Sequence, residues 1–131
     1  MSIATKPNFL RTILLFDAAT CAVMGAALAL ASGPIARFTY IPPSLLFYAG
    51  LSLFPIAAFI AIVAMRPAPA TVWLVILGNL GWVAGSALLL VSSWIAPNGL
   101  GYAFIAVQAA AVAIITKLEH GALRQAVPAA A

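Results

Sequence analysis

Four long apolar stretches constrain this chain more than any other feature of its sequence. They cover residues 10–31, 44–65, 71–92 and 100–116, and each approaches the roughly 20 apolar residues that cross a bilayer as a helix. Only 6% of the 131 residues are charged, whereas a soluble domain carries about 25%. The sequence therefore predicts an integral membrane protein and excludes a large soluble catalytic domain, a nucleic-acid binder and a secreted disulfide scaffold.

Short segments rich in Pro and Gly separate the four stretches. They are 32–43, 66–69 and 96–99. Backbone groups find no partners in lipid, so each apolar stretch is expected to be a helix. Short connections favour antiparallel neighbours. The predicted fold is all-α, a single membrane-spanning four-helix up-down bundle over residues 1–131.

The basic residues predict the orientation in the membrane. Five of the six would share one side with both termini, and they are Lys6, Arg11, Arg66, Lys117 and Arg124. Only Arg37 would lie on the other side, so both termini are expected in the cytoplasm. A cleaved signal peptide ending at Ala31 is the competing interpretation of the first stretch; the length of that stretch and the presence of Asp17 favour a transmembrane helix.

Three polar side chains within the predicted helices are candidates for a functional site, because polar groups in a bilayer are costly. At 1.5 Å per residue, Asp17, Asn79 and Gln108 lie roughly 6 to 13 Å from the predicted cytoplasmic ends, and Pro55 lies about 16 Å in. These four residues are expected to share one layer of the bundle. The site could bind a proton or a cation at Asp17, or it could be a set of interhelical hydrogen bonds, which contribute about 0.6 to 2 kcal/mol each.

Two further features of this layer leave alternatives open. Pro55 predicts a kink that frees the carbonyl near Leu51, to which Asn79, Gln108 or a hydroxyl of the same helix could donate. Trp82 is expected near the midplane, where its indole N–H needs an acceptor, either a carbonyl or Asp17. It could pack against small residues or stack on a ligand. Asp17 could instead extend towards the interface near Arg11.

Small residues are expected to set the helix packing. Gly25 lies two turns after Asp17 on the first helix. A glycine ridge on the third helix is formed by Gly78, Gly81 and Gly85. The first and third helices are therefore expected to meet closely, although the ridge could instead face another subunit.

The remaining reactive residues suggest no catalytic site. Glu119 and His120 are expected at the cytoplasmic surface beyond the last helix, so Asp17 and Glu119 would differ in depth and form no carboxylate pair. Cys21 is expected to be a packing residue. One His gives a poor metal or haem site, and the sequence contains no phosphate-binding or dinucleotide motif. We therefore expect no enzyme activity, no cofactor and no metal.

Several segments together resemble a family of small, uncharacterised bacterial inner-membrane proteins with four transmembrane helices. The segments are 10–11, 17–19, 48–55, 66–69, 78–83, 97–104 and 108–109. The resemblance implies a four-helix membrane protein and supplies no activity. The expected role is an accessory or structural subunit that meets other membrane subunits or copies of itself within the lipid bilayer. The alternative is a small transporter or a proton or ion pathway centred on Asp17.

Overall fold

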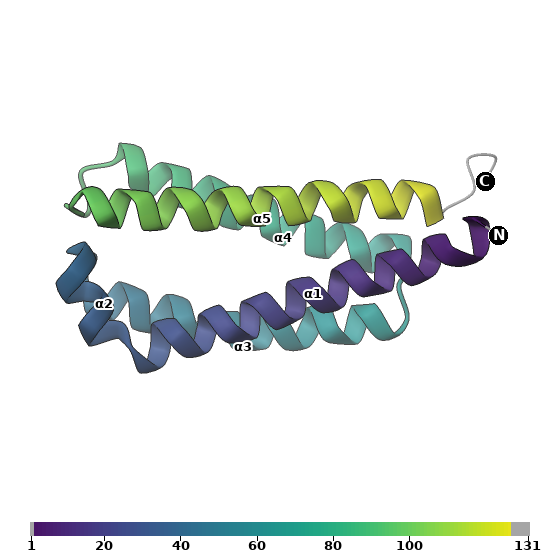
Figure 1. Ribbon diagram of the computed structural model, residues 1–131, viewed down its shortest axis with the longest axis horizontal. Helices are drawn as coiled ribbons and strands as arrows, with labels where there is room; N and C mark the ends of the chain where they lie inside the picture. Colours follow the sequence, from purple (N-terminus) through teal and green to yellow (C-terminus); the bar gives the residue numbers. More distant parts are fainter. Residues whose placement is uncertain (1, 127–131) are drawn as a thin grey trace.

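Four long helices and one short helix make up the fold. The computed structural model describes residues 2–126, with side chains from residue 9 onward. The helices are α1 (Ser2–Leu30), α2 (Ser32–Thr39), α3 (Pro43–Met65), α4 (Pro69–Val91) and α5 (Gly99–Ala126). The four long ones alternate in direction, so that the start of α1 and the end of α5 lie at the same end of the bundle (Figure 1). All four are long and apolar enough to cross a membrane. The predicted four-helix up-down bundle is confirmed, and the chain is a multi-pass membrane protein.

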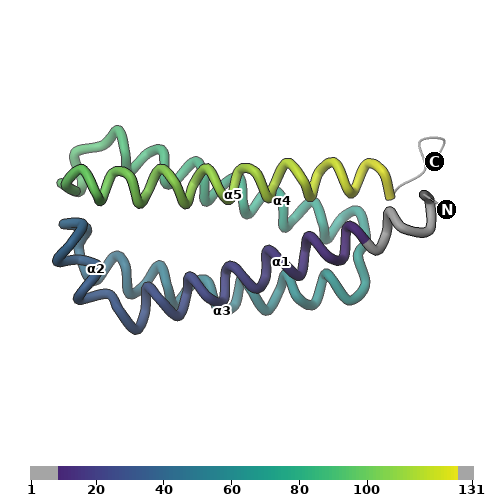
Figure 2. Tube along the Cα trace, in the orientation of Figure 1, coloured from purple at the N-terminus to yellow at the C-terminus, as the bar shows by residue number. Residues whose placement is uncertain are grey.

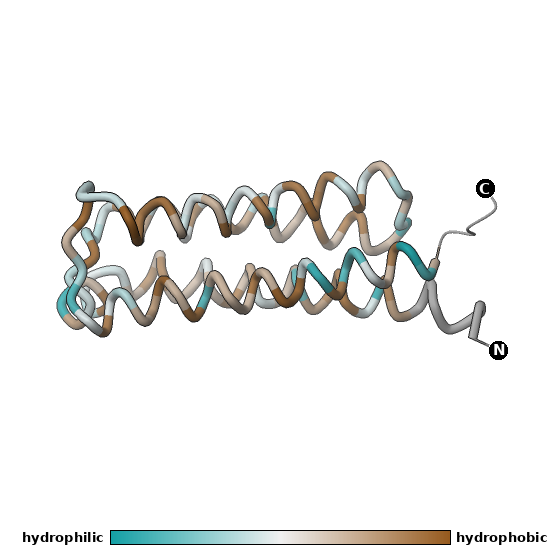
Figure 3. The backbone as a smooth tube through the Cα atoms, turned by 90° about the horizontal axis from the view of Figure 1, so that it is seen from above, coloured by the Kyte–Doolittle hydropathy of each residue, from teal (hydrophilic) through white to brown (hydrophobic). Residues whose placement is uncertain are grey.

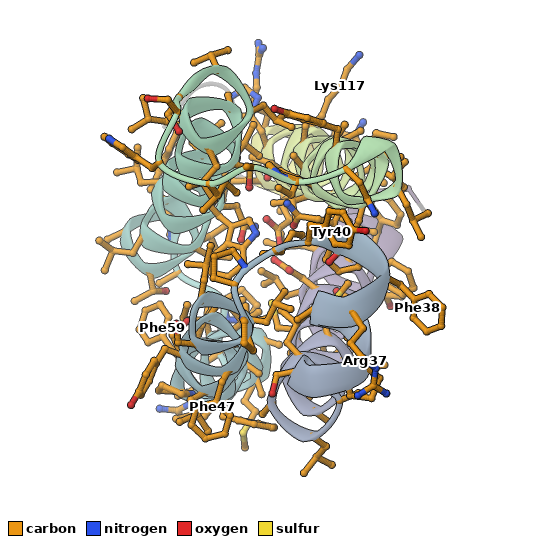
Figure 4. All side chains as sticks on the ribbon, turned by 90° about the vertical axis from the view of Figure 1, so that its left-hand side faces the viewer. Arg37, Phe38, Tyr40, Phe47, Phe59 and Lys117 are labelled. Carbon is orange, nitrogen blue, oxygen red and sulfur yellow. The ribbon has the colours of Figure 1, made fainter. Side chains whose placement is uncertain are left out.

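The long helices form two pairs. The view along the bundle shows α1 with α3 on one side and α4 with α5 on the other (Figure 4). Packing of α1 against α5 joins the pairs, whereas α3 and α4 meet only slightly and the described parts of α1 and α4 make no close backbone approach. The helices α1 and α5 converge towards the end that holds the termini and separate towards α2 (Figure 2).

Apolar side chains fill the interior and also cover the outside. Two buried clusters lie along the bundle, one around Leu14, Ile60 and Val72 and the other around Leu28 and Leu53. Hydrophilic residues gather near the two ends of the bundle and are sparse along its middle (Figure 3). Large apolar side chains point outward from the bundle, including Phe38, Phe47 and Phe59 (Figure 4). Such a surface matches lipid rather than water.

The last helix is longer than predicted. It continues to Ala126, whereas the predicted span ends at residue 116. The buried positions of its final turns recur at helical spacing, and they are Ile115, Thr116, Glu119, Ala122 and Leu123. This stripe keeps packing on the core while Lys117 points away from the bundle (Figure 4). The predicted end was wrong because the charged residues lower the mean hydropathy without interrupting the buried face.

The first predicted loop contains the short helix α2, which the sequence prediction missed. It ends at Thr39, and the next residue, Tyr40, has a left-handed backbone (φ 60°). Asn98 joins this segment to the start of α5: its Nδ2 donates to the Phe38 carbonyl at 2.8 Å, and its Oδ1 accepts from the Gly101 N–H at 2.8 Å. A Cβ on Gly101 would collide with the Thr39 carbonyl, so glycine is required at this junction.

Arg11 fastens α1 to the end of α3. Its Nε donates to the Ala64 carbonyl at 3.1 Å and its Nη2 to the Met65 carbonyl at 3.4 Å. Carbonyls in the last turn of a helix lack intrahelical partners and carry partial negative charge, so a guanidinium stabilises them. The guanidinium of Arg11 is therefore bound to the last turn of α3.

Glycines set the closest helix contact, between α1 and α3. A Cβ on Gly50 would lie 2.7 Å from the Ala29 nitrogen and 2.8 Å from the Gly25 carbonyl. The predicted close contact of the α4 ridge with α1 is wrong, because α4 buries its opposite face. Nothing lies within 4 Å of a Cβ built on the exposed ridge glycines, Gly78, Gly81 and Gly85. Their contact with another subunit stays a prediction.

Because Gly50 is crowded and Gly78 is not, adding a methyl group should lower the stability of the protein at Gly50 only. Gly50→Ala should destabilise the protein by about 1–3 kcal/mol, because rigid backbone surrounds the site. Gly78→Ala makes the same chemical change on an exposed face and should cost nothing. Unfolding by sodium dodecyl sulfate in mixed micelles, followed by circular dichroism, measures both changes. Equal stability of the two variants would contradict the close α1–α3 contact.

Candidate functional site

The two acidic side chains of the chain, Asp17 and Glu119, meet at the side-chain amide of Asn79. Asn79 Nδ2 donates one hydrogen bond to Asp17 Oδ2 at 2.8 Å and another to Glu119 Oε1 at 2.9 Å. The exposed fractions are 2% for Asp17, 6% for Asn79 and 0% for Glu119. The helices α1, α4 and α5 thus contribute one polar side chain each to a site closed to solvent.

The remaining carboxyl oxygens are poorly satisfied. Asp17 Oδ1 accepts only a long bond from Cys21 Sγ, at 3.6 Å, and Glu119 Oε2 is buried without a hydrogen-bond partner among the described residues. Neighbours on the same helix faces, such as Ala18, Ile76 and Ala122, are buried and apolar. A buried acceptor without a donor is costly, so this site is under-coordinated.

Electrostatics favours one proton in the site. The Asp17 and Glu119 carboxyls accept from the same nitrogen, Asn79 Nδ2, so they lie close together. Two negative charges in apolar surroundings would repel each other, and each would also lose its hydration. A proton on one carboxyl removes the repulsion and supplies an O–H donor where donors are scarce. The geometry therefore suits a carboxyl pair that exchanges a single proton.

Gln108 does not join this site. Its Oε1 accepts from the Trp82 indole N–H at 2.9 Å, and its Nε2 donates to Ser86 Oγ at 2.9 Å and to the Ile105 carbonyl at 3.0 Å. Ser86 Oγ in turn donates to the Trp82 carbonyl at 2.9 Å. None of these hydrogen bonds of Gln108 reaches Asp17 or Asn79, although Gln108 lines the same cavity as Asp17. It forms a separate clasp between α4 and α5, and it supplies the acceptor for Trp82 in place of Asp17.

The predicted donors to the carbonyl near Leu51 are also used elsewhere. Pro55 lies inside α3 on an exposed face. Both amide hydrogens of Asn79 go to the carboxyls, and both of those of Gln108 go to Ser86 and Ile105. Ser52 Oγ bonds within its own helix, to the Ala49 carbonyl at 2.7 Å. Pro55 therefore makes no link to the polar site through either amide.

The surface position expected for Glu119 is wrong, and so is the expectation that Asp17 and Glu119 form no pair. Both errors follow from ending the last helix too early. The signal was present in the sequence, because Glu119 falls on the stripe of Ile115, Thr116, Ala122 and Leu123 rather than on the face of Lys117. Asp17 is buried and does not extend towards Arg11.

The other titratable residues around the pair have other contacts. His120 packs edge-on against Trp73 of α4, with ring centroids 5.3 Å apart. Lys117 and Arg124 are exposed. Within residues 2–126 no group of three or more His, Cys, Asp or Glu side chains could hold a metal ion.

A cavity of about 850 Å³ between α1, α2 and α5 borders Asp17 of the carboxyl pair. Its other polar lining residues include Cys21, Gln108 and Trp82. Most other lining residues are apolar. The cavity is partly open, and its rim carries the exposed side chains Phe16 and Val107 on the outer surface of the bundle. The lining therefore includes part of the lipid-facing surface, and it also reaches α2 at one end of the bundle.

The comparisons with known proteins supply no assignment. No family model, curated protein or solved structure matched this chain. The resemblance to four-helix bacterial inner-membrane proteins stays a prediction, and the functional argument depends on the geometry of the carboxyl pair and the cavity.

Removal of the shared donor predicts a loss of stability. Asn79→Leu keeps a side chain of similar size but leaves both carboxyls without their amide donor, which should cost about 1–3 kcal/mol. Ser52→Ala removes an exposed local bond and should change stability by less than about 0.5 kcal/mol. Detergent unfolding of both variants checks this. An Asn79→Leu variant as stable as the Ser52→Ala control would show that the amide bridge contributes nothing.

Proposed function

We propose that this protein is a small membrane carrier whose transport is coupled to a proton held by Asp17 and Glu119. One observation carries the proposal: the chain has two acidic side chains, and both are buried on one amide inside apolar helices. Ionisable groups at membrane depth are costly, and they mark proton relays and ion pathways. Helix packing alone needs no carboxyl pair, since neutral amides such as Gln108 serve the same purpose in this chain.

The position of the pair supports a role in coupling. The α1–α3 unit is joined by Gly25 and Gly50, and the α4–α5 unit by the clasp of Gln108 with Trp82 and Ser86. Asp17 belongs to the first unit, whereas Asn79 and Glu119 belong to the second. Loss of the proton would place a second negative charge at the contact between the units and would push them apart. Proton binding and the relative position of the two units are thereby linked.

We further propose that the protein lies in a bacterial inner membrane with both termini in the cytoplasm. The positive-inside rule supports this orientation, since Arg37 is the single Lys or Arg expected on the opposite side. In this orientation the carboxyl pair lies nearer the cytoplasmic face.

A second candidate function is an accessory or structural subunit of a membrane assembly. The exposed α4 ridge of Gly78, Gly81 and Gly85 favours it, because small residues on a lipid-facing helix allow another helix to approach closely. Extraction in a mild detergent distinguishes the two candidates. A copurifying membrane partner that is lost in Gly81→Leu would support the accessory role, and a pure monomer that carries protons would oppose it.

The carrier proposal predicts that proton movement depends on both carboxyls. In proteoliposomes with an internal pH dye and an imposed pH gradient, the wild-type protein should carry protons, and Asp17→Asn and Glu119→Gln should reduce the rate at least tenfold. Both replacements keep side-chain size and hydrogen bonding to Asn79. Ser52→Ala is the matched control and should transport at the wild-type rate. A wild-type rate in both acid variants would remove the pair from the mechanism.

A further inference from the structure

The hydrogen bonds along the walls of the large cavity specify what kind of molecule it can bind. The polar groups at its surface belong to Asp17, Thr20, Cys21, Thr39, Trp82 and Gln108. Nearly all their donors are already used by the protein. The Thr20 hydroxyl donates to the Asp17 carbonyl at 2.8 Å, and the Thr39 hydroxyl donates to the Ile35 carbonyl at 2.7 Å. The Trp82 N–H and both Gln108 amide hydrogens are bound within the α4–α5 clasp.

A carboxyl acceptor is what remains. Asp17 Oδ2 accepts one hydrogen bond from Asn79, and Oδ1 accepts a weak one from the Cys21 thiol. Each carboxylate oxygen can accept about two hydrogen bonds, so Asp17, which lines the cavity, retains capacity to accept more. A ligand that needs donors, such as a ketone or a quinone, finds none free on these walls except the single proton of the carboxyl pair. A ligand that brings its own donors and a positive charge finds an acceptor and a negative charge.

We propose that the cavity binds a hydrophobic primary or secondary amine, with its ammonium group hydrogen-bonded to Asp17 and its apolar body against α1, α2 and α5. This inference rests on the proposed proton-coupled function and names its substrate class. A volume of about 850 Å³ is within the range of pockets for drug-sized molecules. The apolar rim at Phe16 and Val107 lets such a molecule enter from the bilayer, where hydrophobic amines concentrate.

Binding of the ammonium displaces the proton of the carboxyl pair. With the pair protonated once, the site carries one negative charge. The ammonium supplies one positive charge and N–H donors, so the pair can release its proton to bulk water and become doubly ionised. The charged or titratable groups near the pair are few: Cys21 is on α1, Arg11 is held by α3 carbonyls, and His120 is held by Trp73. The described parts of α3 and α4 present no charged side chain to it. One amine should therefore exchange for about one proton.

Adamantylamine, a rigid apolar cage with one ammonium group, is a suitable probe. Isothermal titration calorimetry of the full chain in nanodiscs, repeated in buffers of different ionisation enthalpy, measures its affinity and the protons released. We expect saturable binding with release of about one proton. Adamantanol has the same cage without charge, and adamantyltrimethylammonium has the charge without N–H donors. Both should bind at least tenfold more weakly, because a charged hydrogen bond contributes about 1.5–3 kcal/mol and 1.4 kcal/mol is tenfold. Equal binding of either analogue would overturn the amine assignment.

Two variants keep the test independent of how well any one of them folds. Asp17→Asn should weaken adamantylamine binding at least tenfold and abolish proton release. Ala111 also lines the cavity, one turn after Gln108 on α5. Ala111→Phe should weaken binding as well, because the added ring occupies the cavity. Unchanged binding in both variants would place the amine elsewhere and overturn the proposal.

Proton movement measured without the amine separates this inference from the proposed function. If protons move through the Asp17–Glu119 pair but adamantylamine does not bind, the substrate class is wrong and proton coupling stands. If adamantylamine binds at Asp17 without proton release, the amine site stands and proton coupling is wrong.

Discussion

The amide nitrogen of Asn79 donates to a carboxyl group on each side, one from α1 and one from α5. An amide offers two hydrogens, and here both are used to hold groups that would otherwise repel each other in an apolar interior. The cost of burying these groups is high in lipid, where water cannot compensate them. This contact therefore fixes the positions of α1, α4 and α5 relative to one another, and any proton chemistry at the site depends on it.

The contact also explains the arrangement of the helices. A different contact stabilises each helix pair. Close approach at glycines joins α1 to α3, and the hydrogen bonds of Gln108 join α4 to α5. Between the pairs, α3 and α4 meet only slightly, and α1 and α5 separate towards α2 (Figure 1). The carboxyl site and the nearby apolar cluster around Leu14 and Ile60 thus provide much of the connection between the pairs. A protonation change at this position would act at the contact between the two helix pairs.

The sequence predicted the architecture well because hydropathy and length decide it. Four apolar stretches, short connections and a bilayer leave few alternatives to a four-helix bundle. Asp17 and Asn79 were correctly expected to lie close together, since their depths agreed. Glu119 was missed because mean hydropathy falls at Lys117, although the buried stripe of α5 continues. Depth along the membrane does not specify how a helix is rotated about its axis. The partner of Gln108 and the outward direction of the α4 glycines depend on that rotation, so the sequence did not predict them.

A proton held by the carboxyl pair is directly measurable because of the composition of the chain. Asp17 and Glu119 are its two acidic side chains, so an infrared band from a protonated side-chain carboxyl can come only from this pair. Difference spectra at neutral pH between the wild-type protein and the Asp17→Asn, Glu119→Gln double variant isolate that band. If Asp17 and Glu119 share one proton, the wild-type protein shows a protonated-carboxyl stretch that is lost in the double variant. Absence of this band from the wild-type protein, with ionised-carboxylate bands for both residues, would show that the pair holds no proton.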